Sequence, residues 1–224
     1  MRLLPPLLLL LAGCSSHLKV PGPLRGLGRA PVVASPRIEE RTPQPPPATP
    51  SPAPTPRPRD DQGRKIADAA RHYLNHRLDG FRDDCSGFVC AASTRAGRPL
   101  TGNTASLWAV LDEEGQTHRR KRPDIGDLAF FDNTYDRNRD GRVNDELTHV
   151  AIVLDVDDDG TILLAHGGTS AGRSELRMNL LHPSDHRADD GTVRNDYLRR
   201  RRSNDRAGTP HLAGEMWRGF ATLP

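Results

Sequence analysis

A long proline-rich segment, from Ser15 to Asp60, limits the part of this chain that can fold. Its densest stretch, TPQPPPATPSPAPTPRPR, lacks the apolar residues that a core needs and favours an extended polyproline II conformation. At about 3.1 Å per residue the segment could reach on the order of 140 Å. We therefore interpret residues 14–60 as a disordered linker, with a recognition role for the prolines left open, and expect one folded domain over residues 61–224.

The first residues, MRLLPPLLLLLAGCSS, have the form of an export signal. Arg2 provides a positive start, and the apolar stretch at residues 7–11 is too short to span a bilayer. The letters LAGC, which end at Cys14, resemble the lipobox of bacterial lipoproteins. We expect a signal peptide at residues 1–13 and a lipid on Cys14. The protein would then lie in the bacterial cell envelope, attached to a membrane by this lipid only and facing the periplasm or the exterior. An ordinary secretory signal, with no role for Cys14, is the alternative.

Charge gives little indication of a partner. The formal net charge is +3, from 32 basic and 29 acidic residues, so we do not expect nucleic-acid binding. One local basic run, Arg199 to Arg202, is most simply a solvated surface, with attraction to an anionic wall polymer as the alternative. We expect a monomer that requires no cofactor.

The folded part predicts helices followed by strands. Apolar residues recur at helical spacing over 64–78, a second helix should begin after Asp83 or Asp84, and residues 103–115 suggest a third. Strands rich in β-branched and apolar residues follow at 126–131, 148–156 and 161–168, and Trp217 and Phe220 suggest a final strand over 214–223. This order predicts an α+β domain in which N-terminal helices pack on a central antiparallel β-sheet.

Two cysteines in the domain, Cys85 and Cys90, have different expected roles. Five positions apart in one helix, their Cα atoms would lie roughly 8 to 9 Å apart, too far for a disulfide. Cys90 is interpreted as a small buried hydrophobic residue. Cys85 lies in the first turn of its helix, where the positive end of the helix dipole lowers the pKa of a thiol. Cys85 is therefore a candidate nucleophile.

A thiol nucleophile needs an imidazole to take its proton and a third group to orient that imidazole. His149 begins one predicted strand and His166 ends the next. A turn centred on Asp157 and Asp158 would place the two histidines opposite each other on one face of the sheet. A turn built on Asp159-Gly160 would instead require a β-bulge to restore the pairing. By itself His149 could equally be a structural histidine.

Four segments together resemble the NlpC-type cell-wall cysteine peptidases: DCSGFV at 84–89, IGDLAFF at 125–131, THVAIVL at 148–154 and AHGG at 165–168. The resemblance covers roughly Ile66 to Ser170. It implies a papain-like α+β fold and a cysteine endopeptidase that hydrolyses peptidoglycan stem peptides, typically between D-γ-glutamyl and a diamino acid.

Residue by residue, the resemblance implies that Cys85 is the nucleophile, His149 the base and acid, and His166 the third polar residue. Asp84 and Ser86 fall where the family contacts substrate, although Asp84 is equally well explained as a helix N-cap. The Tyr-x-x-Gly-Gly stretch that usually precedes the cysteine is replaced here by HRLDGFRD. The tyrosine that assists the oxyanion site therefore has no clear counterpart, and the interval from His149 to His166 is longer than usual.

Two other functions stay open at this stage. A related amidase or acyltransferase would use the same thiol on another amide or ester. A non-catalytic lipoprotein that binds the cell wall could have kept the fold without the chemistry. The candidate set Cys85, His149 and His166 favours an enzyme over the binding protein.

The segment DNTYDRNRDGRVNDELTHV has the spacing of an EF-hand-type calcium loop. Position 12, normally a bidentate glutamate, is Leu147, so Asp145 or Glu146 would have to replace it. A structural Ca²⁺ beside the strand of His149 is one interpretation, and a solvated polar loop is the other. The candidate ligands are Asp136, Asn138, Asp140, Arg142, Asn144, Asp145 and Glu146.

Overall fold

The computed structural model describes residues 58–224, apart from positions 79, 171 and 204. The expected signal peptide, the lipid on Cys14 and all but the end of the linker lie outside the described residues. No helix within the described part is both long enough and apolar enough to cross a membrane.

Three helices come first, as the apolar spacing predicts: α1 (Pro58–Asn75), α2 (Cys85–Arg95) and α3 (Thr104–Glu113). Helix α1 begins shortly before the expected domain start at Asp61. Asp84 is the N-cap of α2, and Asn103 forms a reciprocal capping box with Ser106 at the start of α3. Each cap satisfies backbone N–H groups that the first helical turn leaves free, and so fixes where the helix begins.

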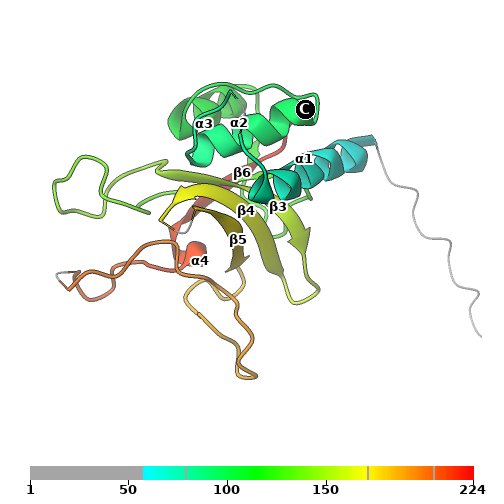
Figure 1. Ribbon diagram of the computed structural model, residues 1–224. Helices are drawn as coiled ribbons and strands as arrows, with labels where there is room; N and C mark the ends of the chain where they lie inside the picture. The colour runs from blue at the N-terminus through cyan, green and yellow to red at the C-terminus, as the bar shows by residue number, and fades with distance from the viewer. Residues whose placement is uncertain (1–57, 79, 171, 204) are drawn as a thin grey trace, which may run out of the picture. The chain divides into compact units, whose positions relative to one another are not determined.

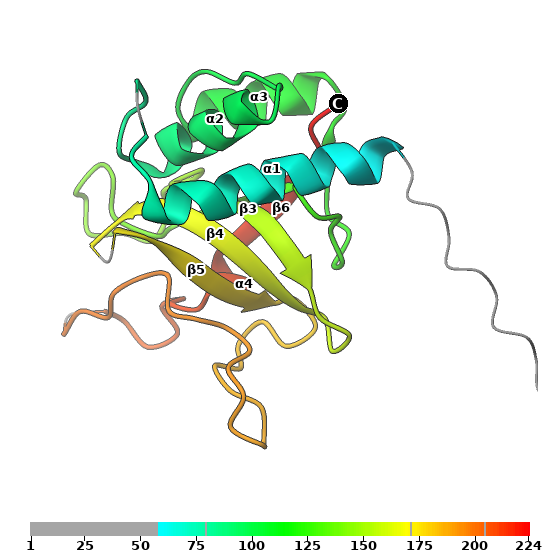
Figure 2. The ribbon, with the colours of Figure 1, turned by 45° about the vertical axis from the view of Figure 1, so that its right-hand side comes forward.

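Six strands form one antiparallel sheet in the order β1-β6-β2-β3-β4-β5. Helices α1, α2 and α3 cover one face of this sheet, and the short helix α4 lies against the other (Figures 1 and 2). The predicted α+β class is confirmed. The remaining elements are β1 (Thr117–His118), β2 (Leu128–Phe131), β3 (His149–Val156), β4 (Thr161–Thr169), β5 (Gly172–Asn179), α4 (Ala213–Met216) and β6 (Trp217–Ala221).

The sheet has a hydrophobic cluster on each face. Val150, Ile152 and Leu154 of β3 pack with the helices, whereas Ala151 and Val153 face a second cluster that includes Met216 of α4. Because β3 is buried on both faces, its sequence is a continuous apolar run instead of an alternating one. This burial holds the strand that carries His149 rigidly in the middle of the domain.

The hairpin between β3 and β4 differs from both predicted geometries. The Gly160 N–H donates to the Asp157 carbonyl at 3.0 Å, so Asp158 and Asp159 are the central turn residues. The register then shifts between Val153 and Asp155, which is a β-bulge. Extending the Ile152–Ala165 register places Ala151, not His149, opposite His166. The two histidines are thus diagonal neighbours on one face, and direct opposition was wrong.

Candidate active site

Cys85 is the first residue of α2, and its position follows from the cap that precedes it. The Asp84 carboxylate accepts hydrogen bonds from the Gly87 N–H at 2.7 Å and from the Ser86 hydroxyl at 2.8 Å. The Cys85 side chain is partly buried, and its sulfur lies 3.6 Å from the hydroxyl of Thr104. The second cysteine, Cys90, is 4% exposed, and burial raises the pKa of its thiol. Both described cysteines are unbridged, as expected.

A chain of hydrogen bonds runs from β3 through β4 to β5. His149 Nε2 lies 2.9 Å from His166 Nδ1, and His166 Nε2 lies 3.1 Å from the Ser174 hydroxyl. Each histidine is only 5% exposed, and the two rings meet edge to face. The prediction that the two histidines interact is confirmed. Since His149 Nε2 is engaged by His166, Nδ1 is the His149 ring nitrogen that has no hydrogen-bond partner among the described residues.

Both buried histidines are neutral at physiological pH. Burial, with a smaller contribution from His166, lowers the pKa of His149 to about 3. Burial also lowers the pKa of His166 to about 4, although the nearby Asp196 carboxylate opposes part of this shift. A neutral imidazole is the form that can accept a proton, so His149 has the protonation state of a base.

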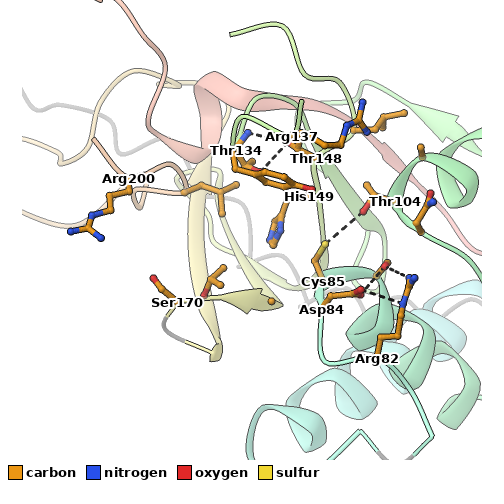
Figure 3. A pocket seen from close by; sticks show the side chains of 18 residues that line it. Arg82, Asp84, Cys85, Thr104, Thr134, Arg137, Thr148, His149, Ser170 and Arg200 are labelled. Carbon is orange, nitrogen blue, oxygen red and sulfur yellow. Dashed lines mark hydrogen bonds and ion pairs between the residues drawn. The ribbon is translucent and has the colours of Figure 1, made fainter. Parts of the chain in front are cut away.

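Cys85 and His149 line one cavity of about 600 Å³. The Cys85 sulfur and the His149 ring both point into it, from α2 and β3 respectively (Figure 3). Asp84 and Ser86 also line this cavity, whereas His166 is not among the lining residues and supports His149 from behind. The structure therefore brings the five predicted catalytic and substrate-binding residues together.

The side chains of Asp84 and Ser86 are largely engaged within the protein. Arg82 contacts both: its Nε lies 3.2 Å from an Asp84 oxygen, and its Nη2 donates to the Ser86 hydroxyl at 2.9 Å. Ser86 is 3% exposed. The N-cap role of Asp84 is thus directly visible, and contact of either residue with a substrate stays a prediction.

The end of β4 lies against the start of α2. Gly168 has a φ of +73°, and a Cβ atom added there would lie 2.6 Å from the Cys85 nitrogen and 2.9 Å from the Asp84 Cα. A glycine is needed at this position both for the backbone conformation and for the close approach. The AHGG stretch therefore positions the backbone of Cys85 as well as supplying His166.

The predicted calcium loop is an irregular segment between β2 and β3. The Asp136 carboxylate accepts the N–H groups of Asp140 and Gly141, and the N–H of Arg142 lowers the pKa of Asp140 by donating to it. Asn138 and Asn144 each donate to the other Asp140 oxygen.

The residues proposed to replace the glutamate of position 12 contact arginines. Asp145 is buried and lies 4.0 Å from Arg137, while Glu146 lies 3.2 Å from Arg218. Among the described residues, no cluster of three or more histidine, cysteine, aspartate or glutamate side chains has an arrangement that could hold a metal ion. Calcium binding, with asparagine and carbonyl ligands completing the site, stays a prediction.

Sequence reasoning did not identify three of the residues around the nucleophile. Thr104 follows a helix cap and carries no motif, and Ser174 lies in β5, which was not predicted. Arg200 lines the cavity from the irregular segment after β5, within a basic run interpreted only as surface. Near these positions the sequence indicated only the third helix, over residues 103–115, which contains Thr104.

Residues 76–168 match the family model of the CHAP domain. A CHAP domain is a cysteine/amidase hydrolase domain found in peptidoglycan hydrolases, and it has the papain-like cysteine peptidase fold. The matched region contains Cys85, His149 and His166 and ends at Gly168. The match supports the broader prediction of a peptidoglycan hydrolase, but it does not establish the narrower NlpC-type assignment. No curated protein and no solved structure matches the chain.

Proposed function

We propose that this protein is a cysteine peptidase that hydrolyses the stem peptides of peptidoglycan. The CHAP match suggests peptidase or amidase activity on this substrate. The observation that carries the proposal is the shared cavity, in which the Cys85 thiol and the neutral His149 imidazole are both accessible to a bound peptide.

The hydrogen-bond chain supports one assignment of the ring protons. For His149 Nδ1 to accept the Cys85 proton, its Nε2 must carry a hydrogen and donate it to His166 Nδ1. His166 then carries its hydrogen on Nε2 and donates it to the Ser174 hydroxyl. Ser174 and His166 thus act as positioning residues that hold His149 in the tautomer that a base requires.

In the proposed reaction the thiol proton passes from Cys85 to His149 Nδ1 while the sulfur attacks the scissile carbonyl carbon. The carbonyl oxygen gains the negative charge, close to the Cys85 backbone N–H at the start of α2. His149 then protonates the departing amine as the C–N bond breaks, which leaves a thioester on Cys85. Water, deprotonated by His149, cleaves this thioester and restores the thiol. The Thr104 hydroxyl, 3.6 Å from the sulfur, can donate to the thiolate as it forms.

The bond that we propose is the one between D-γ-glutamyl and the diamino acid, which the NlpC-type resemblance implies. The test is digestion of purified muropeptides by the wild-type protein and by Cys85→Ala, followed by mass spectrometry of the products. Fragments that end at the γ-glutamyl residue, present only with the wild-type protein, are expected. Release of the intact stem peptide would identify the related amidase instead. No product from either protein would favour a non-catalytic wall-binding protein.

The proposed location is the cell envelope, with the protein attached through a lipid on Cys14. The test is to express the full chain and its Cys14→Ser variant in a bacterium supplied with a labelled fatty acid. Label and membrane association are expected for the wild-type chain only. Equal partitioning of both proteins would leave the ordinary secretory signal as the better explanation.

A further inference from the structure

A second hollow continues from the cavity of Cys85. It encloses about 590 Å³ and shares Thr134, Tyr135 and Arg200 with that cavity. Its other lining residues are Arg199, Arg201, Arg202 and Ser203. Arg200 lies across the cavity from Cys85 (Figure 3). A peptide bound with its scissile carbonyl at Cys85 could therefore extend past Tyr135 to Arg200.

The lining of these two hollows carries an excess of positive charge. Among the described residues that line them, Asp84 is the only acidic one, and it is already paired with Arg82. Arg199 is 7% exposed and structural, because it donates to the Asn133 carbonyl at 2.9 Å and lies 3.8 Å from Asp205. Arg200, by contrast, is exposed and its guanidinium has neither a hydrogen bond nor an ion pair within the described part of the chain.

Three adjacent arginines, 200 to 202, thus line one hollow, and none of its described lining residues is acidic. Such an arrangement attracts an anion, and a guanidinium binds a planar carboxylate through two parallel hydrogen bonds. A peptidoglycan stem peptide carries free carboxylates at its glutamyl residue and at its end. The segment that supplies these arginines lies outside residues 76–168, the part of the chain that matches the CHAP model.

We propose that Arg200 binds a free carboxylate of the peptide substrate, at a subsite remote from the scissile bond. The inference rests on the proposed function, because it takes the occupant of the cavity to be a stem peptide. A carboxylate held there would add binding energy away from the reacting carbonyl. It would therefore lower KM and leave kcat nearly unchanged.

The test compares Arg200→Gln with Arg119→Gln. Arg119 is exposed, makes no ion pair within the described residues and lines neither hollow, so its replacement removes the same charge elsewhere. Arg200→Gln should raise KM for a stem peptide about tenfold, with kcat within about twofold. Arg119→Gln should change neither. A series of peptides in which each free carboxylate is converted to a carboxamide in turn should contain one member whose KM no longer depends on Arg200.

If Arg200→Gln raised KM equally for every peptide of the series, or did not change KM at all, the proposed subsite would be overturned. If inorganic phosphate competed equally well with every peptide of the series, the subsite would also be overturned, in favour of a phosphate-containing wall polymer. Calorimetric binding of the same peptides to the wild-type protein separates this proposal from the proposed function. Binding that depends on Arg200 and on one carboxylate, without hydrolysis, would retain the subsite and contradict the peptidase.

Discussion

Replacing Gly168 by alanine should disturb the nucleophile without touching its side chain. The new Cβ would lie 2.6 Å from the Cys85 nitrogen and 2.9 Å from the Asp84 Cα, whereas ordinary contacts begin at 3.4 Å. Both opposing atoms belong to the backbone, so no side chain can rotate away. The end of β4 or the start of α2 must therefore move by about 0.8 Å, the difference between 3.4 and 2.6 Å. A displacement of this size at a catalytic group can cost on the order of 100-fold in rate.

Gly172→Ala is the matched control for this change. Gly172 has a φ of +79°, close to that of Gly168, but its added Cβ would meet no atom of the described residues within 4 Å beyond its own chain neighbours. Each variant should lose about 1 kcal/mol of unfolding free energy from the left-handed backbone, and Gly168→Ala roughly 1–3 kcal/mol more from overpacking. The assays are kcat/KM on a stem peptide and urea denaturation. Equal rates and equal stabilities for the two variants would refute the reasoning.

Three further predictions concern the histidines and the loop. The pKa values of His149 and His166 are lowered by folding, so their neutral forms stabilise the protein above pH 6.5. This contribution is lost as the pH falls from 6.5 toward about 4 for His166 and about 3 for His149. Denaturant unfolding at stepped pH should show that the free energy of unfolding falls by up to about 1.4 kcal/mol per pH unit for each histidine, and by less in His149→Gln. A free energy of unfolding that does not change with pH would contradict the buried neutral pair. Ser174→Ala should lower kcat about three- to tenfold at unchanged KM, because the hydrogen-bond acceptor for His166 Nε2 is lost. Ser174→Thr keeps a hydroxyl and should recover kcat. An unchanged kcat in Ser174→Ala would contradict the positioning role. If the loop binds calcium, added calcium should raise the melting temperature of the wild-type protein, a chelator should lower it again, and the melting temperature of Asp136→Ala should not change. An unchanged melting temperature of the wild-type protein would favour the solvated loop.

Much of the fold could be predicted from local patterns. The apolar spacing of α1 and α2, the cap at Asp84 and the β-branched run of β3 each correspond to an observed element. The contact between His149 and His166 was also predictable, because both lie at the same end of one hairpin.

The elements that sequence missed are those with a weak local pattern. Strand β5 buries only Leu176, Met178 and Asn179, lies at the sheet edge and is otherwise polar. Because β5 was missed, so was Ser174, the last member of the hydrogen-bond chain. The β-bulge in β3 has no residue type that marks it, so the register of the hairpin could not be derived. Arg200 lies in an irregular segment, and the position of such a segment cannot be predicted from a periodic sequence pattern.

The most direct test of the central idea is the reactivity of the two thiols that the structure describes. With limiting iodoacetamide at neutral pH, peptide mapping by mass spectrometry should find label on Cys85 and not on Cys90, in step with loss of hydrolysis. His149→Gln should slow the labelling of Cys85 at least tenfold, because the base that takes its proton is gone. Preferential labelling of Cys90, or a Cys85 rate that does not depend on His149, would contradict the proposed nucleophile and base.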